Sequence, residues 1–281
     1  MTRVTIRKMT SSDFAFAIRL TDTMHWDLTV RDFKFVMALD PEGCLVALDG
    51  NRKVGITTTA FFDKIGTIGN VIVDPRYRSK GIGAQLVKEA IKYLSKKSVA
   101  TVALYAYMDT VKFYEKLGFK MDSDFIRLAG QGKESHVDTT TIRGMTQRDL
   151  KNAIDFDRVC MGWNREKLLR RIFADSKDLC FVARKENTQL GFIMADRYKQ
   201  EIGPLMCRVD SDDEAIGLLK TVLGRLKGTE VGIGVSEARQ GVADALVDLG
   251  FKEEFRVTLM HLGDKLPDAE CFVAMESLER G

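Results

Sequence analysis

The sequence predicts an α/β fold (α+β in the finer classification) made of two tandem domains, each a mixed, mostly antiparallel sheet flanked by helices. Three observations predict it. Runs of β-branched residues alternate with amphipathic runs of helical spacing along the whole chain. The 281 residues, 45% of them hydrophobic, are enough for two cores of ordinary size. The pattern of the first half also returns in the second, which indicates an internal duplication.

The first half opens with a strand and two helices. Thr10 and Asp13 form a capping-box pattern, and Thr29 and Asp32 repeat it, so each pair marks the start of a helix. Further along, β-branched runs indicate strands, and Gly and Pro end them. The expected elements are strand 4–7, helices from 10 and from 29, strands 44–48, 53–62 and 66–73, a helix ending about 97, strand 99–105, helix 110–117 and closing strands in 119–128.

A polar, glycine-rich segment at 130–135 is a plausible linker, and the pattern begins again after it. Residues 5–10, Thr-Ile-Arg-Lys-Met-Thr, return as Thr-Ile-Arg-Gly-Met-Thr at 141–146. Other matched pairs are Asp13 and Asp149, Trp26 and Trp163, Gly69 and Gly203, and Gly118 and Gly250. The offset between the copies drifts only from 137 to 132 residues, as small insertions and deletions in loops would cause. The sequence therefore predicts domains at residues 1–132 and 137–281.

One stretch of the first half carries a candidate anion site. The buried run Val71-Ile72-Val73 ends at Asp74-Pro75, and the segment Arg78-Ser79-Lys80-Gly81-Ile82-Gly83-Ala84 then leads into an amphipathic helix. A glycine turn between a strand and a helix leaves backbone N–H groups free, and the helix dipole favours an anion there. The stretch predicts a phosphate-binding loop, residues 78–84. The alternative is an ordinary glycine turn with a solvated basic face.

The loop does not fit the two common nucleotide fingerprints. It lacks the Gly-Lys-Ser/Thr ending of a P-loop, and its spacing does not make Gly-x-Gly-x-x-Gly. It reads Arg-x-x-Gly-x-Gly after a strand ending Val-Asp-Pro, which resembles the acyl-CoA loop of the GNAT N-acetyltransferases. The expected order of elements, β-α-α-β-β-β-α-β-α-β, is also that of the GNAT fold. The resemblance implies acetyl-CoA as cosubstrate, with its pyrophosphate on residues 78–84 and its pantetheine arm on the backbone of residues 71–73.

Tyr114 is the candidate catalytic residue. The segment 113–119, Phe-Tyr-Glu-Lys-Leu-Gly-Phe, resembles the GNAT segment in which a tyrosine lies near the coenzyme sulfur. A phenol there can protonate or hydrogen-bond the thiolate that leaves. The second copy has Leu246 at the matching position, so the hydroxyl is the feature that this copy lost. The alternative is a core tyrosine between Phe113 and Leu117.

The second copy also differs at the phosphate-binding loop. There, Asp210, Asp212, Asp213 and Glu214 surround the start of the helix. These acids are typical of helix capping and dipole compensation, and they would repel a phosphate. The second domain is therefore predicted to be a degenerate GNAT-like domain that does not bind acyl-CoA.

The acceptor site is predicted only from the resemblance. In the GNAT fold the connection between the first two helices walls the acceptor pocket, which makes His25 and Asp27 candidate contacts. Tyr107 stands seven residues before Tyr114, where many GNATs carry an asparagine. Asp109 and His25 are both possible general bases, so the base stays open. The acceptor is expected to be a small-molecule amine or an amine of a protein or peptide.

Composition excludes several other classes. The net charge is +3, with 43 basic and 40 acidic residues, which does not indicate a nucleic-acid partner. Without an apolar run of membrane length or a signal-peptide core, we expect no membrane association and a cytoplasmic location. Five cysteines without a Cys-x-x-Cys pair and only three histidines predict no metal site.

Together these patterns predict an acetyl-CoA-dependent N-acetyltransferase with one working site, in the first domain. The expected reaction is direct attack of a neutral amine on the thioester, and the two domains are expected to pack against each other. Within the GNATs, the tandem layout resembles a YitH-like subgroup. The alternative is a non-catalytic acyl-CoA-binding sensor or regulatory protein.

Overall fold

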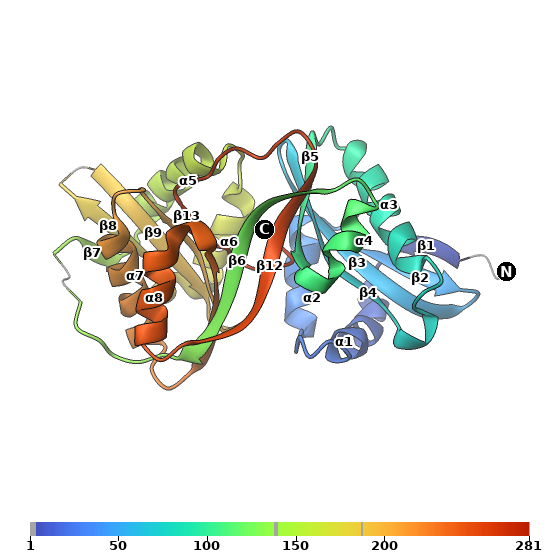
Figure 1. The fold of residues 1–281 in the computed structure, drawn as a ribbon, viewed down its shortest axis with the longest axis horizontal. Coiled ribbons are helices and arrows are strands. Elements are labelled where there is room, and N and C mark those ends of the chain that lie inside the picture. Colours follow the sequence, from blue (N-terminus) through green and yellow to red (C-terminus); the bar gives the residue numbers. More distant parts are fainter. Residues whose placement is uncertain (1–3, 138–139, 187, 281) are drawn as a thin grey trace.

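The computed structural model describes residues 4–137, 140–186 and 188–280; the predicted domain ends at 1–3 and 281 lie outside these ranges. Within the described residues, thirteen strands form one continuous mixed sheet with helices packed on its faces (Figure 1). This arrangement confirms the predicted mixed α/β class. The sequence did not predict that the sheets of the two halves would be continuous.

The elements of the first half follow the expected order. They are β1 (Val4–Lys8), α1 (Phe14–Asp22), α2 (Val30–Leu39), β2 (Leu45–Asp49), β3 (Arg52–Phe62), β4 (Ile65–Val73), α3 (Ile82–Ser95), β5 (Thr101–Tyr107), α4 (Val111–Glu115) and β6 (Lys120–Gln131). The capping boxes expected at Thr10/Asp13 and Thr29/Asp32 are formed. The closing strands expected in 119–128 are one long strand, β6, which extends into the expected linker.

The second half repeats this order and adds a short strand at its end. Its elements are β7 (Ile142–Gly144), α5 (Gln147–Met161), α6 (Glu166–Ser176), β8 (Phe181–Lys185), β9 (Thr188–Asp196), β10 (Glu201–Cys207), α7 (Asp212–Arg225), β11 (Glu230–Ser236), α8 (Gln240–Asp248), β12 (Lys252–Gly263) and β13 (Phe272–Ala274). The repeated Thr146 and Asp149 form a capping box like that of Thr10 and Asp13. The duplication read from the sequence is therefore visible in the local structure.

Helices cover both faces of the first-half sheet. On one face, α3 buries Leu86, Ala90 and Leu94 in a cluster that includes Val102 and Leu104 of β5. On the other face, α1 and α2 pack against β2, β3 and the end of β4. Burial of these apolar side chains stabilises the layers at about 25 cal/mol per Å² removed from water.

The two halves exchange their last long strands. β12 pairs antiparallel with β5, from Val257↔Tyr107 to Gly263↔Thr101. β6 lies on the other side of β12 and pairs with β11, from Ser236↔Phe125 to Glu230↔Gln131. In Figure 1 the green β6 and the orange β12 lie side by side where the halves meet. The sheet does not divide at the predicted domain boundary near residue 132.

We expect truncation after Gly132 to leave a fragment that self-associates. The fragment would keep β6 without either of its neighbours, β11 and β12, and would uncover apolar surface where the halves meet. Size-exclusion chromatography with light scattering, with the full chain as control, measures this. A monomeric fragment that unfolds cooperatively would contradict the expectation and would mean that β6 can pair with β5.

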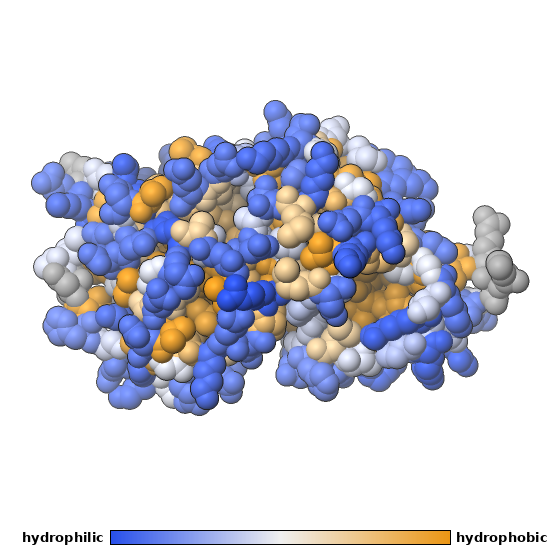
Figure 2. All heavy atoms as spheres, viewed as in Figure 1, coloured by the Kyte–Doolittle hydropathy of each residue, from blue (hydrophilic) through white to orange (hydrophobic). Residues whose placement is uncertain are grey.

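On the face shown in Figure 2, hydrophilic residues cover most of the surface, and hydrophobic residues lie in scattered patches. Among the described helices, none is long and apolar enough to cross a membrane.

Candidate active site

Two neighbouring strands of the first half diverge. β4 and β5 run parallel and pair only from Ile65↔Thr101 to Thr67↔Ala103. Beyond Thr67 the pairing stops, although β4 continues to Val73 and β5 to Tyr107. The backbone of residues 68–73 that faces β5 is therefore free to bind another extended group.

A bulge in β4 lies just beyond the point of divergence. Ile56 and Thr58 of β3 are two residues apart, but their partners on β4, Ile72 and Gly69, are three apart. β4 therefore carries one extra residue. Asn70 in the bulge has a left-handed φ of 51°, and its amide donates to Thr58 Oγ1 at 3.0 Å. The extra residue reverses the alternation of side chains beyond it.

The phosphate-binding loop presents the start of α3. Gly81 is the N-cap residue with a φ of 76°, and the first helical bond runs from Gln85 N–H to Gly81 O at 3.1 Å. The N–H groups of residues 82–84 precede that bond and have no carbonyl within the helix to bind. A Cβ added at Gly83 would meet nothing closer than Phe113 Cζ at 3.6 Å. The loop is therefore open where an anion would bind.

Basic side chains surround this loop. Arg76 turns back onto Asp74, with Nη2 2.7 Å from Oδ2, and its guanidinium lowers the pKa of that carboxyl. Arg78 Nε donates to Val73 O at 3.1 Å, which holds the side chain at the end of β4. The side chains of Arg78 and Lys80 are exposed. These two cations can contact a bound anion, whereas Arg76 is already paired.

The side chains of the other predicted cosubstrate residues differ in exposure. Ile72 and Ile82 are each 2% exposed and belong to the core, so only their backbone can contact a ligand. Val71 lines the pocket described next, and Val73 is half-buried. Ser79 is exposed with a left-handed φ of 61°, and Ala84 is half-buried in the first turn of α3.

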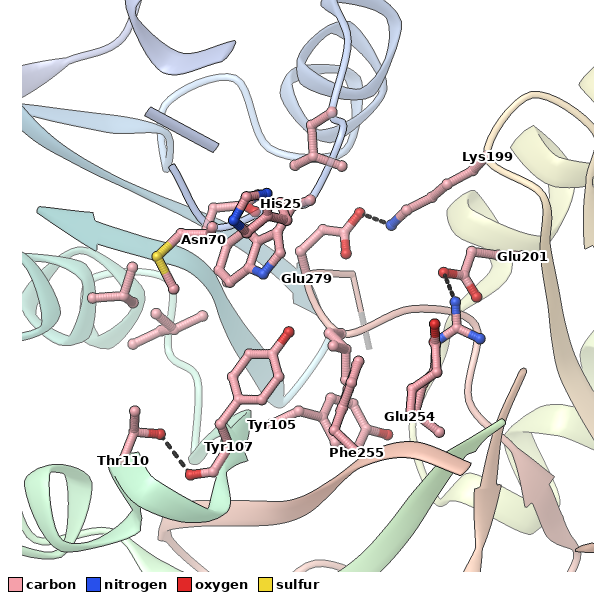
Figure 3. A pocket seen from close by; sticks show the side chains of 18 of the residues that line it. His25, Asn70, Tyr105, Tyr107, Thr110, Lys199, Glu201, Glu254, Phe255 and Glu279 are labelled. Atoms are coloured by element: carbon pink, nitrogen blue, oxygen red, sulfur yellow. Dashed lines mark hydrogen bonds and ion pairs between the residues drawn. The ribbon is translucent and has the colours of Figure 1, made fainter. Parts of the chain in front are cut away.

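A pocket of about 340 Å³ opens where β4 and β5 diverge, and both halves of the chain line it (Figure 3). In this view His25 and Asn70 lie on one side, Lys199, Glu201 and Glu254 lie on the other, and Glu279 lies between them. The residues that the second half supplies are Lys199, Glu201, Glu254, Phe255, Leu278 and Glu279. A pocket of this size suits a small molecule or the end of a side chain.

Tyr114 lies at the boundary between the pocket and the core. It lines the pocket, and its ring also packs edge-on against Phe113 and Phe119, with centroids 4.9 and 5.9 Å away. Burial raises the pKa of Tyr114 to about 12, so its hydroxyl keeps its proton at neutral pH. The packing fits the core interpretation, and the place in the pocket fits the catalytic one.

The match between Tyr114 and Leu246 holds in three dimensions. Phe119 N–H donates to Tyr114 O at 3.1 Å, and Phe251 N–H donates to Leu246 O at 3.0 Å, so both residues occupy the same place before a helix end. Leu246 is fully buried. The second half therefore has the same packing there without the hydroxyl.

The structure brings two of the four predicted acceptor residues to the pocket. His25 and Tyr107 line it, whereas Asp27 and Asp109 are exposed and are not among its lining residues. Trp26 also lines the pocket and stacks on Tyr107, with ring centroids 6.3 Å apart. A matching tryptophan in the second half, Trp163, is typical of a residue needed for the fold, yet Trp26 also contributes to the pocket wall.

The six lining residues of the second half were missed by the sequence reasoning. Arg127 Nη2 donates to Glu201 Oε1 at 2.9 Å, and Lys199 forms an ion pair with Glu279. No local motif surrounds these residues. Glu254 and Phe255 reach the first-half pocket because β12 lies beside β5, and Leu278 and Glu279 reach it because the chain end crosses between the halves. Lys199 and Glu201 come from the turn before β10 and from the start of that strand.

In the second half, the matching gap between strands is filled. β10 and β11 pair in parallel only at Glu201↔Gly232, and β13 inserts between them. β13 is held on one side by Leu205↔Ala274 and on the other by Val235↔Ala274. The chain's own C-terminal strand thus occupies the place where the first half has free backbone.

The start of α7 is also occupied by the protein itself. The guanidinium of Arg239, which is 6% exposed, donates to Asp212 Oδ1 at 3.0 Å and to the carbonyl oxygens of Cys207 and Glu270. Asp212, Asp213 and Glu214 supply negative charge to the first turn. Carboxylates therefore compensate the dipole at this helix start, as the sequence predicted, whereas the N-cap residue Ser211 makes no side-chain capping bond.

No group of three or more His, Cys, Asp or Glu side chains in the described parts of the chain is arranged to hold a metal ion. The five cysteines are free thiols.

Comparison with known proteins gives the same picture. A family model described as the acetyltransferase (GNAT) family matches residues 8–119, and one described as an acetyltransferase (GNAT) domain matches residues 153–272. The uncharacterized N-acetyltransferase YitH of Bacillus subtilis (strain 168) is 24% identical over 214 residues, which is 73% of each chain. This relative agrees with the predicted YitH-like tandem type.

Solved structures share the fold over almost the whole chain. A Pyrococcus horikoshii protein superimposes with a TM-score of 0.82 at 20% identity, covering 100% of this chain and 97% of that one. A tandem GNAT protein from the clavulanic acid biosynthesis pathway superimposes with a TM-score of 0.66 at 12% identity, covering 93% of this chain and 98% of that one. At these identities the likeness shows the fold alone.

Proposed function

Because the chain belongs to the GNAT acetyltransferase family, with two GNAT domains in tandem, we propose that it transfers an acetyl group from acetyl-CoA to an amine, with one working site in the first half. One observation carries the proposal. The open loop at residues 78–84 follows the end of β4, whose backbone does not pair with β5 beyond Thr67, and Val71 of that strand and Tyr114 both line the pocket. The second half lacks these features. β13 lies between β10 and β11, where the first half has unpaired backbone, and Arg239 lies at the start of α7, which corresponds to the start of α3.

The first half has groups that suit each part of coenzyme A. The N–H groups of residues 82–84, together with Arg78 and Lys80, suit the pyrophosphate. Gly83 leaves the space that a phosphate needs close to the helix start. The backbone of Val71 and the N–H of Val73, which do not pair with β5, suit the amides of the pantetheine arm, and Val73 O already accepts from Arg78.

Bound acetyl-CoA would supply a thioester, whose carbon would bond to the nitrogen of the neutral acceptor amine while the carbon–sulfur bond breaks. The nitrogen would lose one proton to solvent, and the leaving thiolate would take one up to become free coenzyme A. A backbone N–H of the free β4 segment can polarise the carbonyl oxygen. Tyr114, which stays protonated, can donate a hydrogen bond to the departing sulfur. The pocket holds the acceptor, and we propose that the second half is retained because it forms one wall of that pocket.

The experiment is a coupled assay of free thiol release from acetyl-CoA with a panel of small amines and amine-bearing peptides. Steady turnover with any acceptor supports an acetyltransferase. Tight coenzyme A binding without thiol release from any acceptor would instead favour the non-catalytic sensor. The absence of both would contradict the assignment of the loop.

Titration calorimetry with coenzyme A is expected to give one equivalent per chain. The first half offers an open loop, whereas β13 and Arg239 occupy the corresponding places in the second half. Gly83→Asp is the control, since it should remove the single equivalent. A second equivalent, or one that survives this substitution, would show that the second half binds the coenzyme.

A further inference from the structure

β10 also carries a bulge, because Ile202 and Leu205 are three residues apart but face Ala195 and Ile193 of β9, which are two apart. The chain end connects the bulges of β4 and β10. Met275 N–H donates to Gly234 O at 2.9 Å beside β13, and a Cβ at Gly203 would lie 1.9 Å from Met275 O. Four residues on, a Cβ at Gly69 would lie 2.6 Å from the Cα of Glu279. The matched glycines of the two bulges are thus both in close contact with the C-terminal segment, residues 275–280. This contact brings Glu279 to β4 at the point where it leaves β5.

Buried ion pairs fix the C-terminal segment. Arg280, which is 0% exposed, pairs with Glu276 at 2.6 Å, and its guanidinium lies 4.3 Å from the centroid of the Phe35 ring in the first half. Glu279, 7% exposed, pairs with Lys199 of the second half. A buried network of this kind holds its members in one geometry. Glu279 therefore has a fixed position in the pocket wall.

The carboxylates of the pocket outnumber its permanent cations. Glu201, Glu254 and Glu279 line it, against Arg127 and Lys199. Arg127 is engaged by Glu201, and Lys199 by Glu279. Within the described residues, Glu254 makes no hydrogen bond or ion pair, and it is exposed at the second-half side of the pocket. The pocket therefore keeps one uncompensated negative charge, at the side away from β4.

Aromatic rings complete the pocket and suit a cation. Tyr107 stacks on Trp26 and also lies 5.0 Å from Phe255, measured between ring centroids. All three rings line the pocket. Aromatic faces attract ammonium groups.

We propose that the acceptor is a small diamine-like compound, with Glu279 facing the amine that reacts, which binds as an ammonium and attacks after losing a proton, and Glu254 facing a second, distal cation. This inference rests on the proposed function. Glu279 belongs to the reacting end because it touches β4, where the thioester would lie. Glu254 belongs to the distal end because it lies across the pocket from Asn70 of that strand.

Three acceptors of equal length test the charge preference by thiol release: 1,4-diaminobutane, pentylamine with a methyl in place of the distal ammonium, and 5-aminopentanoate with a carboxylate there. We expect the diamine to have the highest kcat/KM and the amino acid the lowest. Equal values for diamine and pentylamine, or a preference for 5-aminopentanoate, would overturn the proposal.

Two substitutions separate the two carboxylates. Glu254→Gln should lower kcat/KM for the diamine about 10-fold or more and leave that for pentylamine unchanged. Glu279→Gln should lower kcat/KM for both amines, with coenzyme A affinity retained as a check on the fold. The control is Glu253→Gln, the neighbouring β12 residue, which pairs with Arg256 and does not line the pocket. Parallel losses for both amines in Glu254→Gln would contradict the distal role.

Failure of the proposed function can be told apart from failure of this inference. If no acceptor releases thiol, calorimetry of 1,4-diaminobutane with the coenzyme-saturated protein tests whether the pocket binds a diamine at all. A dissociation constant that rises in Glu254→Gln but not in Glu253→Gln would support the diamine site without transfer activity. No binding of the diamine would overturn the inference.

Discussion

Gly83→Asp is expected to weaken coenzyme A binding at least 100-fold while the protein stays folded. A carboxylate about 4 Å from a phosphate costs roughly 4 kcal/mol at an effective dielectric of 20. Solvent at this half-buried loop reduces that cost, but 2 to 3 kcal/mol still corresponds to about 100-fold in affinity. The fold should tolerate the side chain, because a Cβ at Gly83 finds its nearest atoms at 3.6 Å or more. Titration calorimetry measures the affinity, and thermal unfolding measures the stability.

Two further variants at the same position separate size from charge. Gly83→Ala adds only a methyl group, and Gly83→Asn adds the shape of aspartate without its charge. We expect the loss of affinity to increase from Ala to Asn to Asp. Gly81 is a poorer choice, because its φ of 76° makes any side chain strained. Coenzyme A affinity that is unchanged in Gly83→Asp would refute the loop as the pyrophosphate site.

Tyr114→Phe is expected to lower kcat about 100-fold or more, with coenzyme A affinity little altered. The substitution removes only the hydroxyl and keeps the ring that packs against Phe113 and Phe119. Because burial raises the pKa of Tyr114 to about 12, the hydroxyl stays protonated below that pH. The ratio of wild-type to variant kcat should therefore be constant between about pH 7 and 9. Thiol release under saturating acceptor, measured across this pH range, gives kcat for the wild type and for the variant.

Leu246→Phe is the matched control for Tyr114→Phe, since it changes the corresponding buried position in the half predicted to be inactive. It should alter stability through overpacking and leave coenzyme A affinity unchanged. If Tyr114→Phe instead lowers the unfolding temperature and leaves kcat intact, Tyr114 is a core residue and the leaving thiolate is stabilised by another group.

The sequence by itself determined the local structure and the repeat. Capping boxes at Thr10 and Thr29, β-branched runs and glycine stops depend on residues close together in the chain, so their physical effect can be read there. The glycine turn and helix start at residues 78–84 were predictable for the same reason, because they need only one continuous segment, and phosphate binding there stays a prediction. The duplication added a comparison that separated Tyr114 from Leu246 and the basic loop from the acidic one.

Only the tertiary structure decided which strands pair across the two halves. β6 and β12 are copies of one element, and either can satisfy the backbone of β5, so no local pattern distinguishes β5–β6 from β5–β12 pairing. The same holds for Trp26 and Trp163, which have matching local sequence but different neighbours. The acidic wall of the pocket, with Glu254 and Glu279, follows from this exchange and from the path of the chain end. Its charge is set by contacts between residues far apart in the sequence, which only the folded chain brings together.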